Sequence, residues 1–357
     1  MSKFIVIHQL INQSVGCVNR DEYGYAKNAE VGGYLRGRRS SQNNKRPIRI
    51  GLENELKDYS LRTRKYADTI VSDLVRKGIE KDAALTATAY CMGIVHKKDN
   101  SKKNIKKGDP KIGSDGNLDA SVMAFFSENE LKTITEGIFK ALSENLAIPD
   151  FSKLLKEAKD RLGSSIILFG RMFADNKDIS VEAVSSYSHA LTTNAIEEQS
   201  DYFTAMDDIS KDCGAGMLGD TSFNTGCFYS CAVLNVSELH EYVGEDTSKI
   251  AAAWIKGVCT SFPTARKNSM FCNNFPGYIR MEIVEDALPI SLWDAFDKPV
   301  KASGDLGLLE SSIKALEDHA ENMNRIYEYV KHSYAVNPKD PNSISFKKSI
   351  AEVVSNV

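Results

Sequence analysis

The sequence predicts an α+β fold, in which a sheet domain is assembled from strands that lie far apart in the chain and a mainly helical segment is inserted between them. Three observations lead to this prediction. The chain opens with a run rich in Ile and Val, two similar runs lie beyond residue 226, and helical spacing of apolar residues dominates from residue 56 to residue 162. Strands separated by helices on this scale are typical of a sheet that carries insertions.

The first predicted element is a strand over residues 4–11, where Ile and Val dominate. Residues 12–39 contain five glycines and little periodicity, so a long loop is expected there. Ser40 is a suitable N-cap for a helix that follows it. Pro47 lacks the N–H that a helix interior needs and clashes with the carbonyl four residues earlier. The helix is therefore expected to be one short turn.

The middle of the chain is predicted to be helical. Apolar residues recur there at three- and four-residue spacing, which is the pattern of amphipathic helices. Two helices are expected within residues 56–96, and one each over residues 128–146 and 151–162. Residues 164–169 and 184–191 are short and rich in strand-forming residues, so both are expected to be strands.

The C-terminal part is predicted to return to the sheet. Residues 194–226 are acidic at first and rich in glycine afterwards, which favours a protruding arm over a core segment. Strands are expected over residues 227–236 and 278–283. Helices are expected over residues 247–260 and 308–332.

Charge is unevenly distributed along the chain. The net charge is -3 and the isoelectric point is near 6.1, values that argue against a nucleic-acid-binding protein. Basic residues nevertheless cluster at positions 27–49 and in a lysine-rich loop at 97–111, whereas residues 197–212 are acidic. A local basic stripe on a neutral protein still forms an anion site.

The seven cysteines are odd in number and include no CxxC pair, which indicates free thiols in a reducing compartment. The N-terminal run has one charge before it and no small-residue cleavage site, so we interpret it as a strand and not as a signal peptide. No run approaches the roughly 18 apolar residues of a membrane span. We therefore expect a cytoplasmic protein without a membrane partner.

The sequence offers little for catalysis. The six histidines lie apart, and there is no HExxH, GxSxG, P-loop or GxGxxG motif. Carboxylates at Asp207 and Asp208, and at Asp175 and Asp178, could in principle hold Mg²⁺, but we interpret both pairs as solvated acidic faces. We expect no catalytic residue, no metal and no cofactor, and we interpret each isolated histidine as structural.

The strongest candidate site is the segment 18–46. Arginine suits bidentate phosphate binding, and the pair Gly32 and Gly33 permits close approach of the backbone to a ligand. N–H groups near Ser41 and Gln42 at the helix start could also face an anion. A solvated basic face is the alternative. The seven cations of the segment are Arg20, Lys27, Arg36, Arg38, Arg39, Lys45 and Arg46.

A second candidate site lies in the expected arm. Residues 202–206 and 217–218 are largely apolar although no core is predicted there. Such side chains can stack on bases or insert between them, which is how single strands are held without sequence readout. Packing of the same side chains back on the body of the protein is the alternative.

These motifs resemble the backbone subunit of type I-E Cascade, the CasC family of CRISPR-associated RAMP proteins. The family pattern LNRDD...K.A.FGG..R.R.SSQ..KR is similar to NRDEYGYAKNAEVGGYLRGRRSSQNNKR at residues 19–46. Further similarities are GRM at 170–172, SHALTTN at 188–194, DYFTAMDD at 201–208 and LGDTSFNTGCFY at 218–229. They occur in the family's order and cover most of the chain.

The resemblance implies a hand-shaped α+β subunit. It would have an RRM-like (ferredoxin-like) palm, a large helical fingers insertion and a β-hairpin thumb. The implied boundaries are palm at 1–57, fingers at 58–183, a palm strand at 184–195, thumb at 196–226 and the rest of the palm at 227–357.

The resemblance also implies a function, that of a non-catalytic subunit that binds CRISPR RNA. Copies would stack head to tail along the guide, and each thumb would cross the guide and displace a nucleotide periodically. The implied partners are CRISPR RNA, the target DNA strand paired to it, further copies of the chain and other Cascade subunits.

Position by position, the resemblance assigns two groups of residues. The RNA-backbone contacts would be Arg20, Lys27, Arg38, Ser40, Gln42, Lys45 and Arg46. The wedge around the displaced nucleotide would be Met172, Phe203, Thr204, Met206 and Leu218. Two other functions stay open: a metal-dependent RAMP subunit that cleaves RNA with a loop aspartate, and a generic single-stranded RNA-binding protein.

Overall fold

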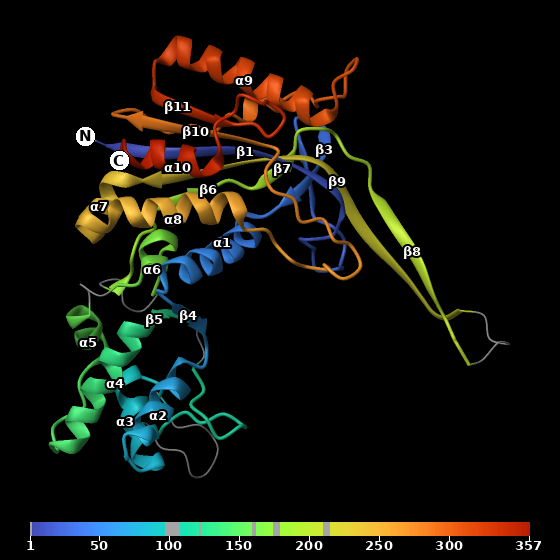
Figure 1. Cartoon of the computed structure of the whole chain (residues 1–357). Coiled ribbons are helices and arrows are strands. Elements are labelled where there is room, and N and C mark those ends of the chain that lie inside the picture. Colours follow the sequence, from blue (N-terminus) through green and yellow to red (C-terminus); the bar gives the residue numbers. More distant parts are fainter. Residues whose placement is uncertain (1, 97–107, 121–122, 159–161, 174–178, 210–214) are drawn as a thin grey trace. The chain divides into compact units, whose positions relative to one another are not determined.

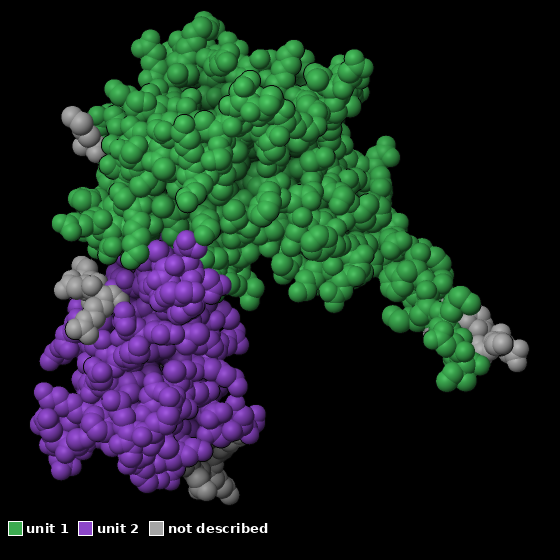
Figure 2. Space-filling model, in the orientation of Figure 1, with its two compact units in different colours: residues 1–52, 185–357 green, residues 53–184 purple. Residues whose placement is uncertain are grey.

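The computed structural model describes residues 2–96, 108–120, 123–158, 162–173, 179–209 and 215–357 (Figure 1). The chain forms two compact units (Figure 2). The sheet unit comprises residues 1–52 and 185–357, and the helical unit comprises residues 53–184. Helices and antiparallel strands are mixed, which confirms the predicted α+β class. No helix among the described residues is long and apolar enough to cross a membrane.

The sheet unit is built on one antiparallel sheet with the order β11-β10-β1-β9-β7-β3-β2. The first strand, β1, lies at the centre and pairs with β10 on one side and β9 on the other. Short β6 and the exposed strand β8 also pair with β9. The strands are β1 (Lys3–Gly16), β2 (Asn28–Val31), β3 (Tyr34–Arg39), β6 (Ser185–Tyr187), β7 (Ala190–Thr192), β8 (Gln199–Met206), β9 (Ala215–Asn235), β10 (Tyr278–Glu285) and β11 (Val330–Val336).

Helices cover both faces of this sheet, and β1 is accordingly buried without a break from Ile5 to Ile11. Helix α9 (Leu308–Tyr327) packs on one face, where Leu316 joins Val6 and Leu10 in a common core. Figure 1 shows α8 (Thr247–Thr260) on the other face, where Trp254 is fully buried and donates a hydrogen bond to Tyr187 at 2.7 Å. Helices α7 (Val236–Val243) and α10 (Phe346–Val354) complete the unit.

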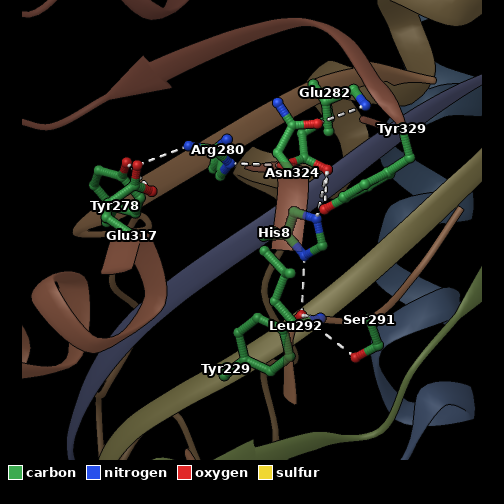
Figure 3. Close-up of polar contacts among 11 residues, drawn as sticks. His8, Tyr229, Tyr278, Arg280, Glu282, Ser291, Leu292, Glu317, Asn324 and Tyr329 are labelled. Carbon is green, nitrogen blue, oxygen red and sulfur yellow. Dashed lines mark hydrogen bonds and ion pairs between the residues drawn. The ribbon is translucent and has the colours of Figure 1, made fainter. Parts of the chain in front are cut away.

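A buried polar network links the central strands to α9 (Figure 3). The imidazole of His8 contacts the Tyr229 hydroxyl at 2.9 Å and the Glu282 carboxylate at 3.4 Å. The same carboxylate accepts a hydrogen bond from Arg280 at 2.6 Å, and Arg280 also donates to Glu317 of α9 at 2.7 Å. Buried charges are tolerated when they are paired in this way.

The prediction of a long loop over residues 12–39 is wrong. Strand β1 continues to Gly16, and β2 and β3 form a hairpin whose register joins Val31 to Tyr34. Its two-residue turn is Gly32 and Gly33, with φ of 62° and 79°. A turn with two positive φ angles matches the twist of paired strands, and glycine adopts it without steric cost.

The prediction that Pro47 limits the first helix to one turn is also wrong. Helix α1 runs over Ser41–Leu56 with Pro47 inside it. Ile48 and Leu52 on this helix are buried, and a Cβ on Gly257 of α8 would lie only 3.3 Å from the Ile48 carbonyl. Proline removes one backbone hydrogen bond, whereas tight packing on α8 stabilises the whole helix.

The helical unit has a core of its own. Phe126 lies at its centre, with the rings of Tyr66, Phe151 and Phe173 at 5.1 to 5.8 Å. The elements of the unit are β4 (Ser60–Thr63), α2 (Tyr66–Arg76), α3 (Lys81–Met92), β5 (Ala124–Ser127), α4 (Glu128–Ser143), α5 (Phe151–Glu157) and α6 (Ser164–Phe169). Strands β4 and β5 pair with each other in a separate two-stranded sheet.

Two further expectations about secondary structure are corrected. Residues 164–169 form helix α6 instead of a strand, because a fully buried apolar run has no periodicity that separates the two. Residues 308–332 were expected as one helix, but α9 ends at Tyr327 and Glu328 takes a left-handed conformation. Strand β11 then begins at Val330.

Candidate nucleic-acid interface

The start of helix α1 is held by hydrogen bonds to the preceding loop. The Ser40 hydroxyl accepts the N–H of Asn43 at 3.3 Å, so Ser40 is the N-cap. The Ser40 N–H donates to Asn19 at 2.8 Å, and the Asn43 amide donates to the Val18 carbonyl at 3.0 Å. Ser40 is itself buried, and its role is to fix the helix N-terminus, where the first-turn N–H groups favour an anion.

Cations surround this helix start without acidic partners. Arg20 and Arg46 are exposed, together with the neutral Gln42, and Lys27, Arg38 and Lys45 are half-buried. Within the described residues, none of these five cations has a carboxylate within 4 Å. The Lys45 ammonium lies 5.8 Å from the centre of the Tyr187 ring. A set of cations without counter-ions creates a positive potential suited to phosphates.

Two of the seven candidate cations have a structural role instead. Arg36 is fully buried and donates to the carbonyls of Thr192, Thr193, Phe296 and Asp297. These bonds join β3 to the segments on either side. Arg36 is therefore not available to a ligand.

Arg39 is the second buried cation. Its guanidinium lies 4.5 Å from the centre of the Phe228 ring and 5.1 Å from that of Phe262. Burial lowers the pKa of Arg39 to about 10, against weaker opposing effects of Cys272 and Cys227. The group is thus held by aromatic faces within the sheet unit.

The apolar candidates lie on the hairpin formed by β8 and the distal half of β9. Its register pairs Phe203 with Gly219 and Thr204 with Leu218. All of β8 is exposed, and the side chains of Met206 and Leu218 are 87% and 59% exposed. A Cβ on Gly219 would lie 2.3 Å from the Phe203 ring, so this glycine makes room for the ring. These side chains do not pack into the body of the unit.

The base of the hairpin is hydrogen-bonded to the basic segment. The Ala26 N–H donates to Ser222 at 2.9 Å, and the Asn224 amide donates to the Lys27 carbonyl at 2.8 Å. Phe223 packs against the small core that contains Ala26. Arg266 donates to Thr221 at 3.0 Å. The basic segment and the exposed hairpin are therefore joined by hydrogen bonds at the base of the hairpin.

The remaining candidates lie elsewhere. Met172 belongs to the helical unit, where its side chain is 87% exposed. Asp207 and Asp208 are exposed just after β8, and Asp207 accepts the N–H of Ile209 at 2.8 Å. The second acidic pair, at 175 and 178, and most of the lysine-rich loop lie outside the described residues.

His189 is a site residue that the sequence interpretation missed. Its Nδ1 lies 3.3 Å from a guanidinium nitrogen of Arg38, which is 151 residues away in the chain. Partial burial lowers the pKa of His189, and the charges of Arg38 and Lys27 lower it further. Its place in the SHALTTN motif is the signal that could have identified it.

Comparison with known proteins gives one family and a shared fold. A chain from a structure described as "CRISPR RNA-guided surveillance complex, pre-nicking" is similar with a TM-score of 0.84, 23% identity and 99% coverage of both chains. A chain from a "CRISPR RNA-guided surveillance complex" gives a TM-score of 0.74 and 21% identity, covering 99% of this chain and 100% of the other. The search of curated proteins finds no match. The family model Cas_CT1975, described as "CT1975-like protein", matches residues 5–355, and the chain therefore belongs to this family.

Proposed function

We propose that this chain is a non-catalytic backbone subunit of a type I-E Cascade complex that binds CRISPR RNA. The observation that carries the proposal is a segment of unpaired cations joined to an exposed apolar hairpin. Membership of the CT1975-like family and a fold shared with chains of CRISPR RNA-guided surveillance complexes support it. Guide-target pairing supplies the sequence specificity, so the protein reads backbone and shape.

The cations and the hairpin have different tasks. Arg20, Lys45 and Arg46 bind guide phosphates beside the N-terminus of α1, where the helix dipole adds to their charge. Met206 and Leu218 on the hairpin contact bases, because exposed apolar side chains can insert between neighbouring bases without reading their sequence. The hairpin displaces a nucleotide at each crossing, and the intervening bases stay free to pair with target DNA.

Copies of the chain associate head to tail along the guide. A heterologous interface that does not close produces a helical filament. The number of copies is then set by the length of RNA. Mixing the protein with guides of two lengths and measuring particle mass tests this, because the filament predicts more copies on the longer guide. A fixed stoichiometry on both guides indicates a generic RNA-binding protein instead.

The phosphate contacts are tested by salt dependence. The double variant Arg20→Ala with Lys45→Ala should reduce the slope of log affinity against log salt by about 1.4, since each contact to single-stranded RNA contributes about 0.7. The matched control is Lys331→Ala with Lys347→Ala, which removes two exposed lysines on β11 and α10. An unchanged slope in the first variant would refute the proposed phosphate site.

The absence of catalysis is tested on the assembled complex. Target RNA incubated with the complex and Mg²⁺ should stay intact over the time in which DNA binding reaches equilibrium. Cleavage that is lost on Asp207→Asn or Asp208→Asn would replace the scaffold with a metal-dependent nuclease.

A further inference from the structure

His189 lies directly before β7, on the exposed surface beside β3. Its Nδ1 is 3.3 Å from Nη1 of Arg38. A guanidinium has only donors, so Nδ1 must be the acceptor and the neutral ring carries its hydrogen on Nε2. The geometry therefore identifies a neutral imidazole whose Nδ1 is occupied by a neighbouring cation.

The charged groups that act on this ring are Arg38 of β3 and Lys27 just before β2. Glu198 lies in the same region and accepts a hydrogen bond from the Asn28 amide at 2.7 Å. No carboxylate of the described residues lies within 4 Å of Lys27, Arg38 or His189. Two cations and a proton acceptor thus share a surface that contains no counter-ion.

We infer that His189 completes a phosphate-binding cluster with Lys27 and Arg38, and that it takes up one proton from solvent when a phosphate of single-stranded RNA enters the cluster. The inference rests on the proposed function, because that function supplies the phosphate. The negative charge of the phosphate offsets the two cations that keep the ring neutral. Protonation places a hydrogen on Nδ1 of His189, and this nitrogen can then no longer accept a hydrogen bond from Arg38. The His189 imidazolium and the Arg38 guanidinium both donate to phosphate oxygens instead.

The sign of the pH dependence follows from this exchange. In the free protein the pKa of His189 lies below its ordinary value, and in the complex it is raised. The added affinity is complete below the free-state pKa and is lost as the pH rises through the pKa of the complex. RNA binding should therefore tighten as the pH falls below about 7.

The test is a set of binding titrations of the full chain with a labelled single-stranded RNA, between about pH 5.5 and about pH 8. Each unit by which the complex raises the pKa adds about tenfold to the affinity at the acidic end. The variant His189→Gln keeps an acceptor for Arg38 but cannot titrate, and it should lose this added affinity. His332→Gln is the matched control, since His332 is exposed on β11 at the opposite edge of the sheet.

Two measurements decide the outcome. The salt slope of the wild type should be steeper by about 0.7 at the acidic end than at the alkaline end, and His189→Gln should show no such difference. The ring signal of His189 in NMR should titrate at higher pH with RNA than without it. RNA binding with the same pH dependence in His189→Gln overturns the inference alone. A wild type that binds no RNA at any pH overturns the proposed function as well.

Discussion

His8 and His189 belong to the same sheet unit and have opposite surroundings. His8 is completely buried in β1, where it contacts Tyr229 and the carboxylate of Glu282 (Figure 3). His189 is exposed and contacts Arg38. The first ring has an acid beside it, and the second has only cations.

The pKa values of the two histidines move in opposite directions. Burial opposes the charge of His8, but Tyr229, Cys231 and Glu282 act the other way and raise its pKa well above the ordinary value. Partial burial and two cations lower the pKa of His189. At His8 the neighbouring groups therefore outweigh burial, whereas at His189 burial and the neighbouring cations act in the same direction. Paired charges inside the sheet hold the fold together, whereas unpaired charges outside it are available to a ligand.

The largest expected effect comes from removing the acid beside His8. Glu282→Gln leaves buried His8 without a carboxylate and leaves Arg280 with that of Glu317 alone, which should lower the free energy of unfolding by roughly 3–5 kcal/mol. Urea unfolding followed by circular dichroism measures it.

The matched control for that change is Glu285→Gln on the same strand. Its carboxylate meets Lys3 at 3.2 Å near the surface, and such a pair contributes at most about 1 kcal/mol. An equal loss of unfolding free energy in the two variants would contradict the expected difference between a buried and an exposed charge pair.

Removing the proposed base contacts of the hairpin formed by β8 and β9 should give the next largest effect. Met206→Ser combined with Leu218→Ser removes two exposed apolar side chains, each of which would contribute about 1.5–3 kcal/mol when fully buried against a base. Affinity for single-stranded RNA should fall at least tenfold, while thermal stability stays unchanged.

A surface change elsewhere serves as the control for the hairpin. Leu288→Ser alters a residue that is equally exposed but lies beyond β10, outside the proposed interface. A similar loss of RNA affinity in this control would show that general surface hydrophobicity accounts for the binding.

The pH dependence of stability sharpens the comparison further. The pKa of His8 is raised in the folded state, so its contribution to stability is complete below the unfolded value of about 6.5 and is lost as the pH rises through the folded value. Each unit of elevation corresponds to about 1.4 kcal/mol. The urea midpoint of the wild type should fall as the pH rises, and His8→Gln should flatten this decline. If the urea midpoint of His8→Gln falls with pH as steeply as that of the wild type, His8 is not the group responsible for the pH dependence.

The smallest effect is expected for the single half-buried cation Arg38. Arg38→Ala should reduce the salt slope of RNA binding by about 0.7 and change the free energy of unfolding by less than about 0.5 kcal/mol. A loss of stability comparable to that of Glu282→Gln would place Arg38 among the structural charges instead.

Much of the fold could be predicted from local patterns. Strands β1 and β10 and helix α8 have the composition and spacing of their elements, and the structure has them at those places. The hairpin of β2 and β3 was missed although its Gly32 and Gly33 turn is a hairpin signal in its own right. The length of α1 depends on packing against Gly257, which lies about 200 residues away in the sequence and gives no local signal.

The candidate surface was less predictable than the fold. Composition identifies seven cations between residues 18 and 46, but only the tertiary structure shows that Arg36 and Arg39 are buried while Arg20 and Arg46 are exposed. The pairing of β3 with β7 brings His189 to Arg38. A contact made through strand pairing has no spacing rule in a single sequence.

Strand β9 has different pairing partners along its two halves. From Asn224 to Asn235 it pairs with β1 at the centre of the sheet, and from Ala215 to Phe223 it pairs with β8 in the exposed hairpin. Residues 221–223 are held at the base of the hairpin, so the free arm of β9 runs from Ala215 to Asp220, which is about 20 Å at roughly 3.3 Å per residue. A force on this arm is transmitted as bending to the part of β9 that pairs with β1, so the tension of a bound polymer would be borne by the central strands of the sheet.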